Sequence, residues 1–197
     1  WLNNLGANVT GIGLPPDTDP SLFKLLNGID LCESHVYDIR DYERLSSHIR
    51  KIKPEVVFHL AAQPLVRQGY EDPLNTFSVN LMGTTNLLES MRGMETVRSA
   101  VMVTTDKVYR TNNCFKPYKE DDPLGGHDPY SASKAGTEII IESYSKSFLS
   151  EQGLSLATAR AGNVIGGGDW SKDRLFPDAI RAWQSKKILN VRQPESI

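Results

Sequence analysis

The segment YSASK (130–134) combines a tyrosine and a lysine four positions apart. On a helix, residues with this spacing lie one above the other on the same face. An ammonium held beside a phenol favours the phenolate and lowers the phenol's pKa. Tyr130 is therefore a candidate base for a substrate hydroxyl, and Lys134 a candidate contact for the ribose of a nicotinamide cofactor. The spacing alone is weak support, because exposed helices often produce it by chance.

A second polar cluster lies about 25 residues earlier in the chain. The apolar stretch SAVMV (99–103) runs directly into TTDKVY (104–109). One predicted strand end is therefore followed directly by a hydroxyl (Thr105), an acid (Asp106) and a base (Lys107). The alternative is a polar turn that only caps the strand. The two clusters in this order favour the chemical interpretation.

The residues from 106 to 128 form a long segment rich in Pro, Gly, Asn and charge. Loops of this length inside a compact domain are uncommon and are usually functional or disordered. This one leaves the carboxyl end of a predicted strand, where open α/β sheets bind their ligands. We therefore interpret it as a functional loop.

These clusters are carried by alternating strands and helices. We expect strands at about 8–14, 34–38, 55–60, 99–105 and 155–160, and helices at about 41–52, 74–92, 129–152 and 174–186. Asp41 is a predicted N-cap, and Leu45, Ile49 and Ile52 form one apolar stripe. Such alternation with apolar strands is typical of a parallel sheet covered on both faces. The predicted fold class is an α/β, Rossmann-type doubly wound parallel sheet.

The opening WLNNL resembles the last turn of a helix, with Gly6 as the residue that ends it. We therefore expect the fold to lack its first strand and the phosphate loop that follows. Most of the C-terminal substrate lobe is expected to be absent as well. The predicted domains are an NAD-binding Rossmann domain over 1–187 and the start of a substrate lobe over 188–197.

The bulk composition excludes several classes of function. The chain has 197 residues, 39% of them hydrophobic, and a formal net charge of -2. This charge gives no reason to expect nucleic acid or a membrane surface as a partner. Neither a membrane-spanning run nor a signal peptide is apparent, and we expect a cytoplasmic protein. Cys32 and Cys114 are expected to be reduced thiols, with one disulfide as the alternative, and no metal site is expected.

The sequence resembles the extended short-chain dehydrogenases. The segments that carry the resemblance are HLAAQ (59–63), NLMGT (80–84), VTTDKVY (103–109), YSASK (130–134) and RAGNVIG (160–166). Within that family the chain is most similar to the CDP-glucose 4,6-dehydratases. The closer match is carried by HLAAQPLVR (59–67), EDDPLGGHDPYSASK (120–134) and ARAGNVIGGGDWSKDRLFPD (159–178).

The resemblance implies roles for the polar residues after the strand at 99–103. The dTDP-glucose and GDP-mannose dehydratases carry an acidic residue as the base of this motif, and UDP-galactose epimerases have neither acid nor base there. Here the residues are Thr105, Asp106 and Lys107, as in the CDP-glucose enzymes. The implied catalytic set is Thr105, Asp106, Lys107, Tyr130 and Lys134.

The resemblance also implies a cofactor site for NAD. Its contacts are Asp38, Ile39, Leu60, Ala61, Ala62, Gln63, Asn80, Tyr130 and Lys134. The Asp38 carboxylate should accept the amino hydrogens of the adenine. Small residues at 61 and 62 let the backbone approach the dinucleotide, although tight helix packing explains them equally well. Asn80 has an equally plausible purely structural role.

Asn163 and Arg174 match positions that meet the pyrophosphate of a nucleotide sugar. A guanidinium fork suits phosphate oxygens, while the alternative for Arg174 is a solvated charge at a helix start. No acidic residue directly follows the strand at 8–14, where Leu14, Pro15 and Pro16 stand instead. Local chemistry therefore leaves NAD and NADP both open, and NAD depends on the resemblance. The resemblance also implies a homo-oligomer, either a dimer or a tetramer.

The implied reaction is a dehydration of CDP-glucose to CDP-4-keto-6-deoxyglucose. Tyr130, helped by Lys134 and oriented by Thr105, takes the proton of the C4 hydroxyl as hydride leaves C4. Lys107, if neutral, removes the C5 hydrogen, and protonated Asp106 gives a proton to the departing C6 hydroxyl before hydride returns to C6. Burial would have to oppose the charged forms of Asp106 and Lys107. The alternatives are a nucleotide-sugar 4-epimerase on the same scaffold and a non-catalytic nucleotide-binding protein.

Overall fold

The chain alternates strands and helices, in agreement with the prediction. The computed structural model describes residues 1–26, 31–110, 117–191 and 194. The strands are β1 (Thr10–Gly13), β2 (Glu33–Val36), β3 (Val56–His59), β4 (Ser99–Val103) and β5 (Ser155–Ala159). The α-helices are α1 (Leu22–Leu25), α3 (Tyr42–Ile52), α4 (Val66–Glu71), α5 (Pro73–Phe77), α6 (Gly83–Met91), α7 (Pro129–Tyr144) and α8 (Leu175–Gln184). Short 3-10 turns occur at η1 (Asn3–Leu5) and η3 (Asp106–Val108), and π-helical turns at η2 (Ser78–Met82) and η4 (Ser145–Leu149).

The chain divides into two compact units. The first joins Trp1–Val36 to Asn163–Ile197, and the second is Tyr37–Gly162. The second unit contains β3, β4 and β5, and it carries both polar clusters from which the sequence analysis began. The predicted boundary between residues 187 and 188 stays a prediction.

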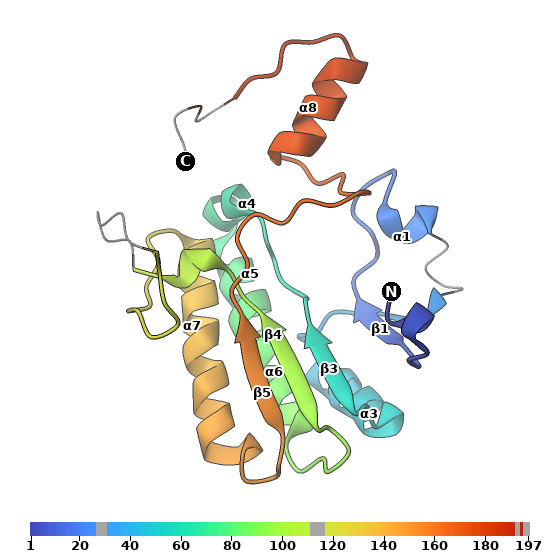
Figure 1. The fold of residues 1–197 in the computed structure, drawn as a ribbon, viewed down its shortest axis with the longest axis vertical. Coiled ribbons are helices and arrows are strands. Elements are labelled where there is room, and N and C mark those ends of the chain that lie inside the picture. Colours follow the sequence, from blue (N-terminus) through green and yellow to red (C-terminus); the bar gives the residue numbers. More distant parts are fainter. Residues whose placement is uncertain (27–30, 111–116, 192–193, 195–197) are drawn as a thin grey trace. The chain divides into compact units, whose positions relative to one another are not determined.

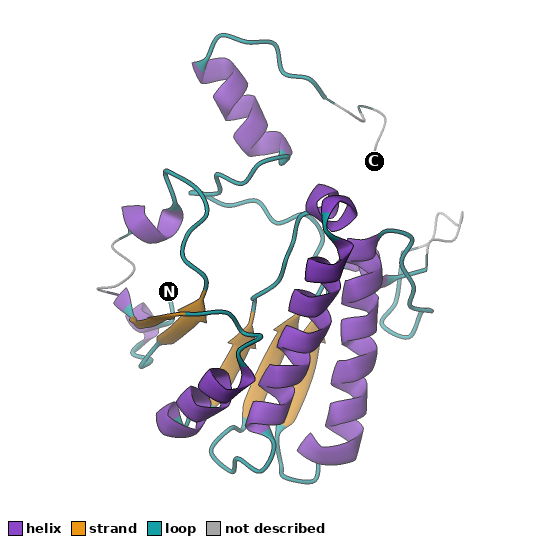
Figure 2. Cartoon of the chain, turned by 180° about the vertical axis from the view of Figure 1, so that it is seen from behind, coloured by secondary structure: helices purple, strands orange, loops and turns teal. Residues whose placement is uncertain are grey.

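The second unit is a three-stranded parallel sheet with helices on one face. The strand order is β3-β4-β5, with Val56 opposite Ser99 and Ser99 opposite Ser155. Figures 1 and 2 show α6 and α7 lying across one face of this sheet. Ala100 and Met102 of β4 have no exposed surface. They point to the same face of the sheet, because alternate residues of a strand do so. The core of the unit therefore lies between β4 and these helices.

The first unit contains the remaining pair of strands. β1 and β2 are parallel, with Thr10 opposite Glu33 and Gly13 opposite Val36. Parallel strands in both units, with helices between them along the chain, confirm the expected α/β, Rossmann-type class.

Helix ends follow local chemistry. The Asp41 side chain accepts a hydrogen bond from Arg44 N at 3.2 Å, which confirms it as the N-cap of α3. Gly6 ends η1 in the left-handed region with φ 86°, as the sequence predicts. The expected helix 74–92 is helical throughout but includes the π turn η2, which contains Asn80. α4 was not predicted, because its six residues are too few to show a helical period.

None of the described helices is long and apolar enough to cross a bilayer. Within the same residues, no group of three or more His, Cys, Asp or Glu side chains is placed to hold a metal ion. Cys114 lies outside the described residues. The expectation about the two cysteines therefore stays a prediction.

Candidate active site

The start of α7 holds Tyr130 in a defined place. Asp128 is the N-cap, and its carboxylate accepts hydrogen bonds from Tyr130 N and Ser131 N, each at 3.0 Å. The Ser131 hydroxyl oxygen in turn accepts from Asp128 N at 3.2 Å, which completes a capping box. Pro129 occupies the first helical position, where its missing N–H costs nothing. The backbone of Tyr130 is thereby fixed, and its side chain is half-buried.

Lys134 lies one turn further along α7 and is only 4% exposed. Its Nζ donates a hydrogen bond to the carbonyl oxygen of Val103, the last residue of β4, at 2.9 Å. Burial lowers the pKa of Lys134 to about 8, and the nearby Glu138 carboxylate opposes part of this shift. The helix therefore brings the lysine of the first polar cluster to the strand end from which the second cluster begins.

Thr105, Asp106 and Lys107 follow that strand end as a short turn. Thr105 is buried, donates from Oγ1 to Asp106 Oδ1 at 3.0 Å and accepts from Lys107 N at 3.4 Å. It therefore also caps η3, as the alternative interpretation expects. The side chains of Asp106 and Lys107 are exposed. Within the described residues, Lys107 forms no ion pair with a carboxylate.

Asn80 links the end of β3 to α7. Its Oδ1 accepts from Gln63 N at 2.8 Å, and its Nδ2 donates to Gln63 O at 3.2 Å and to Ser133 Oγ at 2.8 Å. Ser133 Oγ then donates to the carbonyl of Tyr130 at 2.7 Å. Asn80 is 1% exposed, and its amide is used within the protein. We therefore expect Asn80 to act on the cofactor side by positioning Gln63 and α7.

The end of β3 and the residues after it differ in exposure. Leu60 is 71% exposed, and Ala61 and Ala62 are partly exposed. Before them, His59 is buried and its Nε2 lies 2.9 Å from Thr84 Oγ1. Thr84 Oγ1 donates to Asn80 O at 2.7 Å, so its oxygen accepts the Nε2 proton of His59. Burial, with the charge of Lys134, lowers the pKa of His59 to about 4.

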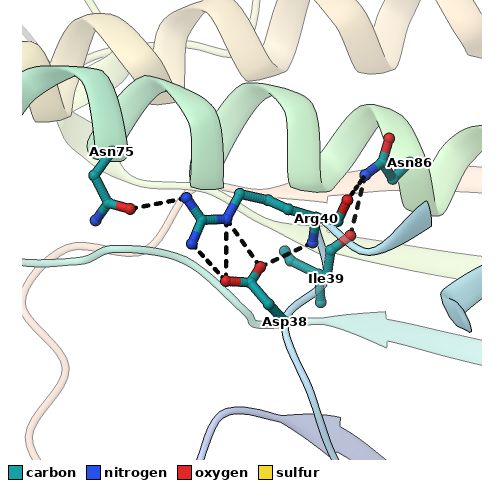
Figure 3. Close-up of polar contacts among 5 residues, drawn as sticks. All are labelled: Asp38, Ile39, Arg40, Asn75 and Asn86. Carbon is teal, nitrogen blue, oxygen red and sulfur yellow. Dashed lines mark hydrogen bonds and ion pairs between the residues drawn. The ribbon is translucent and has the colours of Figure 1, made fainter.

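Asp38 and Ile39 precede α3 and belong to a hydrogen-bonded group with Arg40, Asn75 and Asn86 (Figure 3). The Arg40 guanidinium donates to both Asp38 carboxylate oxygens, the shortest distance being 2.6 Å from Nη2 to Oδ2. These hydrogen bonds hold the pKa of Asp38 below its usual value. Arg40 Nη1 also donates to Asn75 Oδ1 at 2.9 Å, and Asn86 Nδ2 donates to the carbonyls of residues 39 and 40. The Asp38 carboxylate is therefore ionised and fixed in orientation.

Asn163 and Arg174 belong to the first unit, whereas the other predicted site residues belong to the second. Asn163 is exposed. Arg174 is the N-terminal residue before α8, and its Nε lies 3.7 Å from Asp169 Oδ2. That Nε atom is buried and has no hydrogen-bond partner in the described part of the chain. Their contact with the pyrophosphate of a nucleotide sugar stays a prediction.

Glu138 and Arg160 form an ion pair that the sequence did not lead us to predict. Arg160 donates from Nε to Glu138 Oε1 at 3.1 Å and from Nη2 to Oε2 at 3.0 Å. The Thr104 hydroxyl also donates to Glu138. Burial opposes ionisation of Glu138, but these hydrogen bonds outweigh it and lower its pKa. The available signal was spacing, because Glu138 follows Lys134 by the same four residues that separate Lys134 from Tyr130.

Comparisons with known proteins identify the family of this chain. The family model described as GDP-mannose 4,6 dehydratase matches residues 26–166. The chain is 46% identical over its whole length to the CDP-glucose 4,6-dehydratase of Salmonella typhimurium, of which it covers 56%. It is 32% identical over 77% of its length to the UDP-glucose 4-epimerase of Mycolicibacterium smegmatis, of which it covers 48%.

Among solved structures, a double mutant of dTDP-glucose 4,6-dehydratase from Streptomyces venezuelae, with NAD and DAU bound, superposes with a TM-score of 0.76. The two chains are 25% identical, and the superposition covers 90% of this chain and 53% of the other. The fold and the site thus define a Rossmann-type protein of the extended short-chain dehydrogenase class. Within it, the chain belongs to the GDP-mannose 4,6 dehydratase family. It spans about half the length of the curated relatives it matches.

Proposed function

We propose that the whole protein is an NAD-dependent lyase that converts CDP-glucose to CDP-4-keto-6-deoxyglucose. One observation carries the proposal. Lys134 of α7 contacts the end of β4, and the turn Thr105-Asp106-Lys107 begins at that same end. The 46% identity to a CDP-glucose 4,6-dehydratase, which extends over the whole chain, supports the choice of substrate. We include a cytoplasmic location and a homo-oligomeric assembly in this proposal.

The described residues fit a nicotinamide dinucleotide. An ammonium has three donors, and among the described residues Lys134 Nζ uses one of them on Val103 O. Two donors therefore suit the paired hydroxyls of a ribose. The ionised and oriented Asp38 carboxylate suits the amino group of an adenine. When bound, NAD would accept a hydride from the sugar C4 and return it to C6.

Tyr130 would take the proton of the sugar C4 hydroxyl at its phenolic oxygen. Its place at the first turn of α7 is fixed by Asp128, and Lys134 lies on the same face one turn later. The buried ammonium of Lys134 would stabilise the phenolate electrostatically. Thr105, which is buried beside the strand end, would orient the hydroxyl.

Lys107 and Asp106 would then expel water from the ketone. Lys107 Nζ takes the C5 proton, the C6–O bond breaks, and the Asp106 carboxyl gives its proton to the departing hydroxyl. After hydride returns to C6, Lys107 gives the proton back to C5. The proton gained by Tyr130 balances the one lost by Asp106. The overall change is the loss of one water molecule.

The exposure of Asp106 and Lys107 adds a condition to this scheme. The sequence leads us to expect that Asp106 and Lys107 are buried, but both side chains are exposed, so this expectation is wrong. The scheme therefore needs the bound sugar to cover this turn during turnover.

A 4-epimerase is the alternative, since relatives include UDP-glucose 4-epimerases at 32% identity or less. An epimerase expels no water and needs no acid and base after β4. The presence of both Asp106 and Lys107 therefore favours the dehydratase.

The test is to incubate the full-length protein with CDP-glucose and catalytic NAD. We expect a 4-keto-6-deoxy product, detected by its absorbance in alkali, without net formation of NADH. Stoichiometric NADH accumulation during steady turnover, or formation of CDP-galactose alone, would contradict the proposal.

A further inference from the structure

The ion pair between Glu138 and Arg160 lies next to the strand end that carries the proposed acid and base. The two side chains are 5% and 15% exposed, respectively, and their contact is bidentate. The Thr104 hydroxyl donates to the same carboxylate. A bidentate pair fixes the orientation of the guanidinium as well as its position. Arg160 is therefore held by Glu138 of α7, and the same carboxylate bonds Thr104 at the end of β4.

The same guanidinium also contacts the loop between β4 and α7, at Tyr109 and Glu120. Arg160 Nη1 donates to the carbonyl oxygen of Glu120 at 2.8 Å. The guanidinium also lies over the ring of Tyr109, 5.0 Å from its centroid. Tyr109 stacks on Tyr118, with ring centroids 4.5 Å apart and an angle of 2° between the rings. Arg160 thus contacts the segment that leaves β4 and the segment that returns to α7.

These two segments are also paired with each other. Arg110 N donates to Pro123 O, and Gly125 N donates to Val108 O, each at 2.8 Å. The return segment then reaches α7 so closely that a Cβ at Gly126 would lie 2.4 Å from Ala132 N. Asp106 and Lys107 stand at the beginning of this paired structure. Their position relative to α7 therefore depends on what holds the pair of segments in place.

We propose that Arg160, held by Glu138, is a positioning residue for the elimination step. It fixes the paired segments against α7 so that Asp106 and Lys107 meet the C5–C6 end of the sugar. This inference rests on the proposed dehydratase function. Tyr130 and Lys134 have separate support from Asp128 and from the Val103 carbonyl. The oxidation at C4 should therefore depend much less on Arg160 than the elimination does.

The kinetic test uses Arg160→Lys and Arg160→Met in the full-length protein, in single turnovers with CDP-glucose. We expect reduced cofactor to form at close to the wild-type rate. Its disappearance, which reports completed elimination, should slow by about tenfold to a hundredfold. Lysine keeps the charge but lacks the fork, so Arg160→Lys should resemble Arg160→Met. Arg98→Met is the matched control, because the Arg98 side chain is 74% exposed and, in the described part of the chain, forms its ion pair with exposed Glu55.

Equal slowing of oxidation and elimination, or a full wild-type rate in Arg160→Lys, would overturn the proposal. A second measurement does not depend on the reaction. Tryptic cleavage after Lys119, beside the tethered Glu120 carbonyl, should become several-fold faster in both Arg160 variants while Arg98→Met stays unchanged. Unchanged cleavage would also overturn the proposal. A wild-type protein that does not dehydrate CDP-glucose would instead contradict the proposed function, and cleavage would still decide whether Arg160 holds the loop.

Discussion

Lys134 and Lys107 are the two lysines of the proposed reaction, and the fold treats them in opposite ways. Lys134 is 4% exposed, donates to the Val103 carbonyl and has its pKa lowered to about 8 by burial. Lys107 is exposed, and within the described residues its ammonium has no ion-pair partner. Both lie near the end of β4. Lys134 reaches it from α7, and Lys107 follows it in η3.

The difference indicates that the two halves of the reaction are prepared to different degrees. A preorganised group needs no reorganisation when charge develops, and the surroundings of Tyr130 and Lys134 have this character. The side chains of Asp106 and Lys107 are exposed, although their neighbours Thr105 and Val108 are buried. In the proposed reaction, the lysine of the oxidation site is therefore buried and held, whereas the elimination pair is exposed to solvent.

Tyr130→Phe should have the largest effect, because it removes the group that receives the first proton. We expect the rate to fall by about 10³- to 10⁴-fold, with no reduced cofactor after a single turnover. Absorbance at the reduced nicotinamide band measures this. Reduced cofactor at the wild-type level would show that the site around α7 is not where oxidation begins.

Lys107→Ala should stop the reaction one step later. We expect turnover to fall by about 10²- to 10³-fold, while reduced cofactor and a 4-keto-glucose intermediate accumulate. Lys119→Ala is the control, because Lys119 is an exposed lysine in the same loop. Continued exchange of the C5 hydrogen with solvent deuterium in Lys107→Ala would exclude Lys107 as the C5 base.

His59 reports on how dry the surroundings of Lys134 are. Its folded pKa of about 4 lies below the ordinary 6.5, so the unfolded state binds the proton more tightly. The protein should therefore lose stability as the pH falls from about 6.5 to about 4, by about 3 kcal/mol for this shift of about 2.5 units. Urea unfolding of the full-length protein across this range measures the loss.

His59→Gln should remove that part of the pH dependence, whereas His127→Gln, at an exposed histidine, should keep it. An unchanged dependence in His59→Gln would mean that the region around Lys134 is more hydrated than its burial indicates.

Glu138→Gln should weaken the hold on Arg160 and so slow elimination as the Arg160 variants do, and it should add a smaller effect on the pH profile that those variants lack. The Glu138 carboxylate raises the pKa of Lys134, so its removal should bring that pKa below about 8. If charged Lys134 is the active form, kcat/KM falls as pH rises through its pKa, and this alkaline decline should move to lower pH. Of the charged groups near Lys134, His59 is neutral above about pH 6 and should not contribute. Arg160→Met keeps the carboxylate and should not move the decline downward.

Several features were predictable from local patterns in the sequence. Strand and helix alternation, the Asp41 cap and the left-handed Gly6 depend on neighbouring residues, and the structure confirms them. The stripe of Tyr130 and Lys134 likewise depends only on helical spacing. A run of apolar residues ending in Thr105, Asp106 and Lys107 marks a strand end, whatever the rest of the chain does.

The tertiary structure alone decided which distant groups meet. Asn80 bonds Ser133, 53 residues later, and Arg160 bonds Glu138, 22 residues earlier on a different element. No local pattern encodes these pairings, because they depend on how α7 packs beside β4 and β5. Packing likewise buried Lys134 and left Lys107 exposed. The residue types of the site are thus a property of the sequence, whereas their burial, and with it their protonation, is a property of the fold.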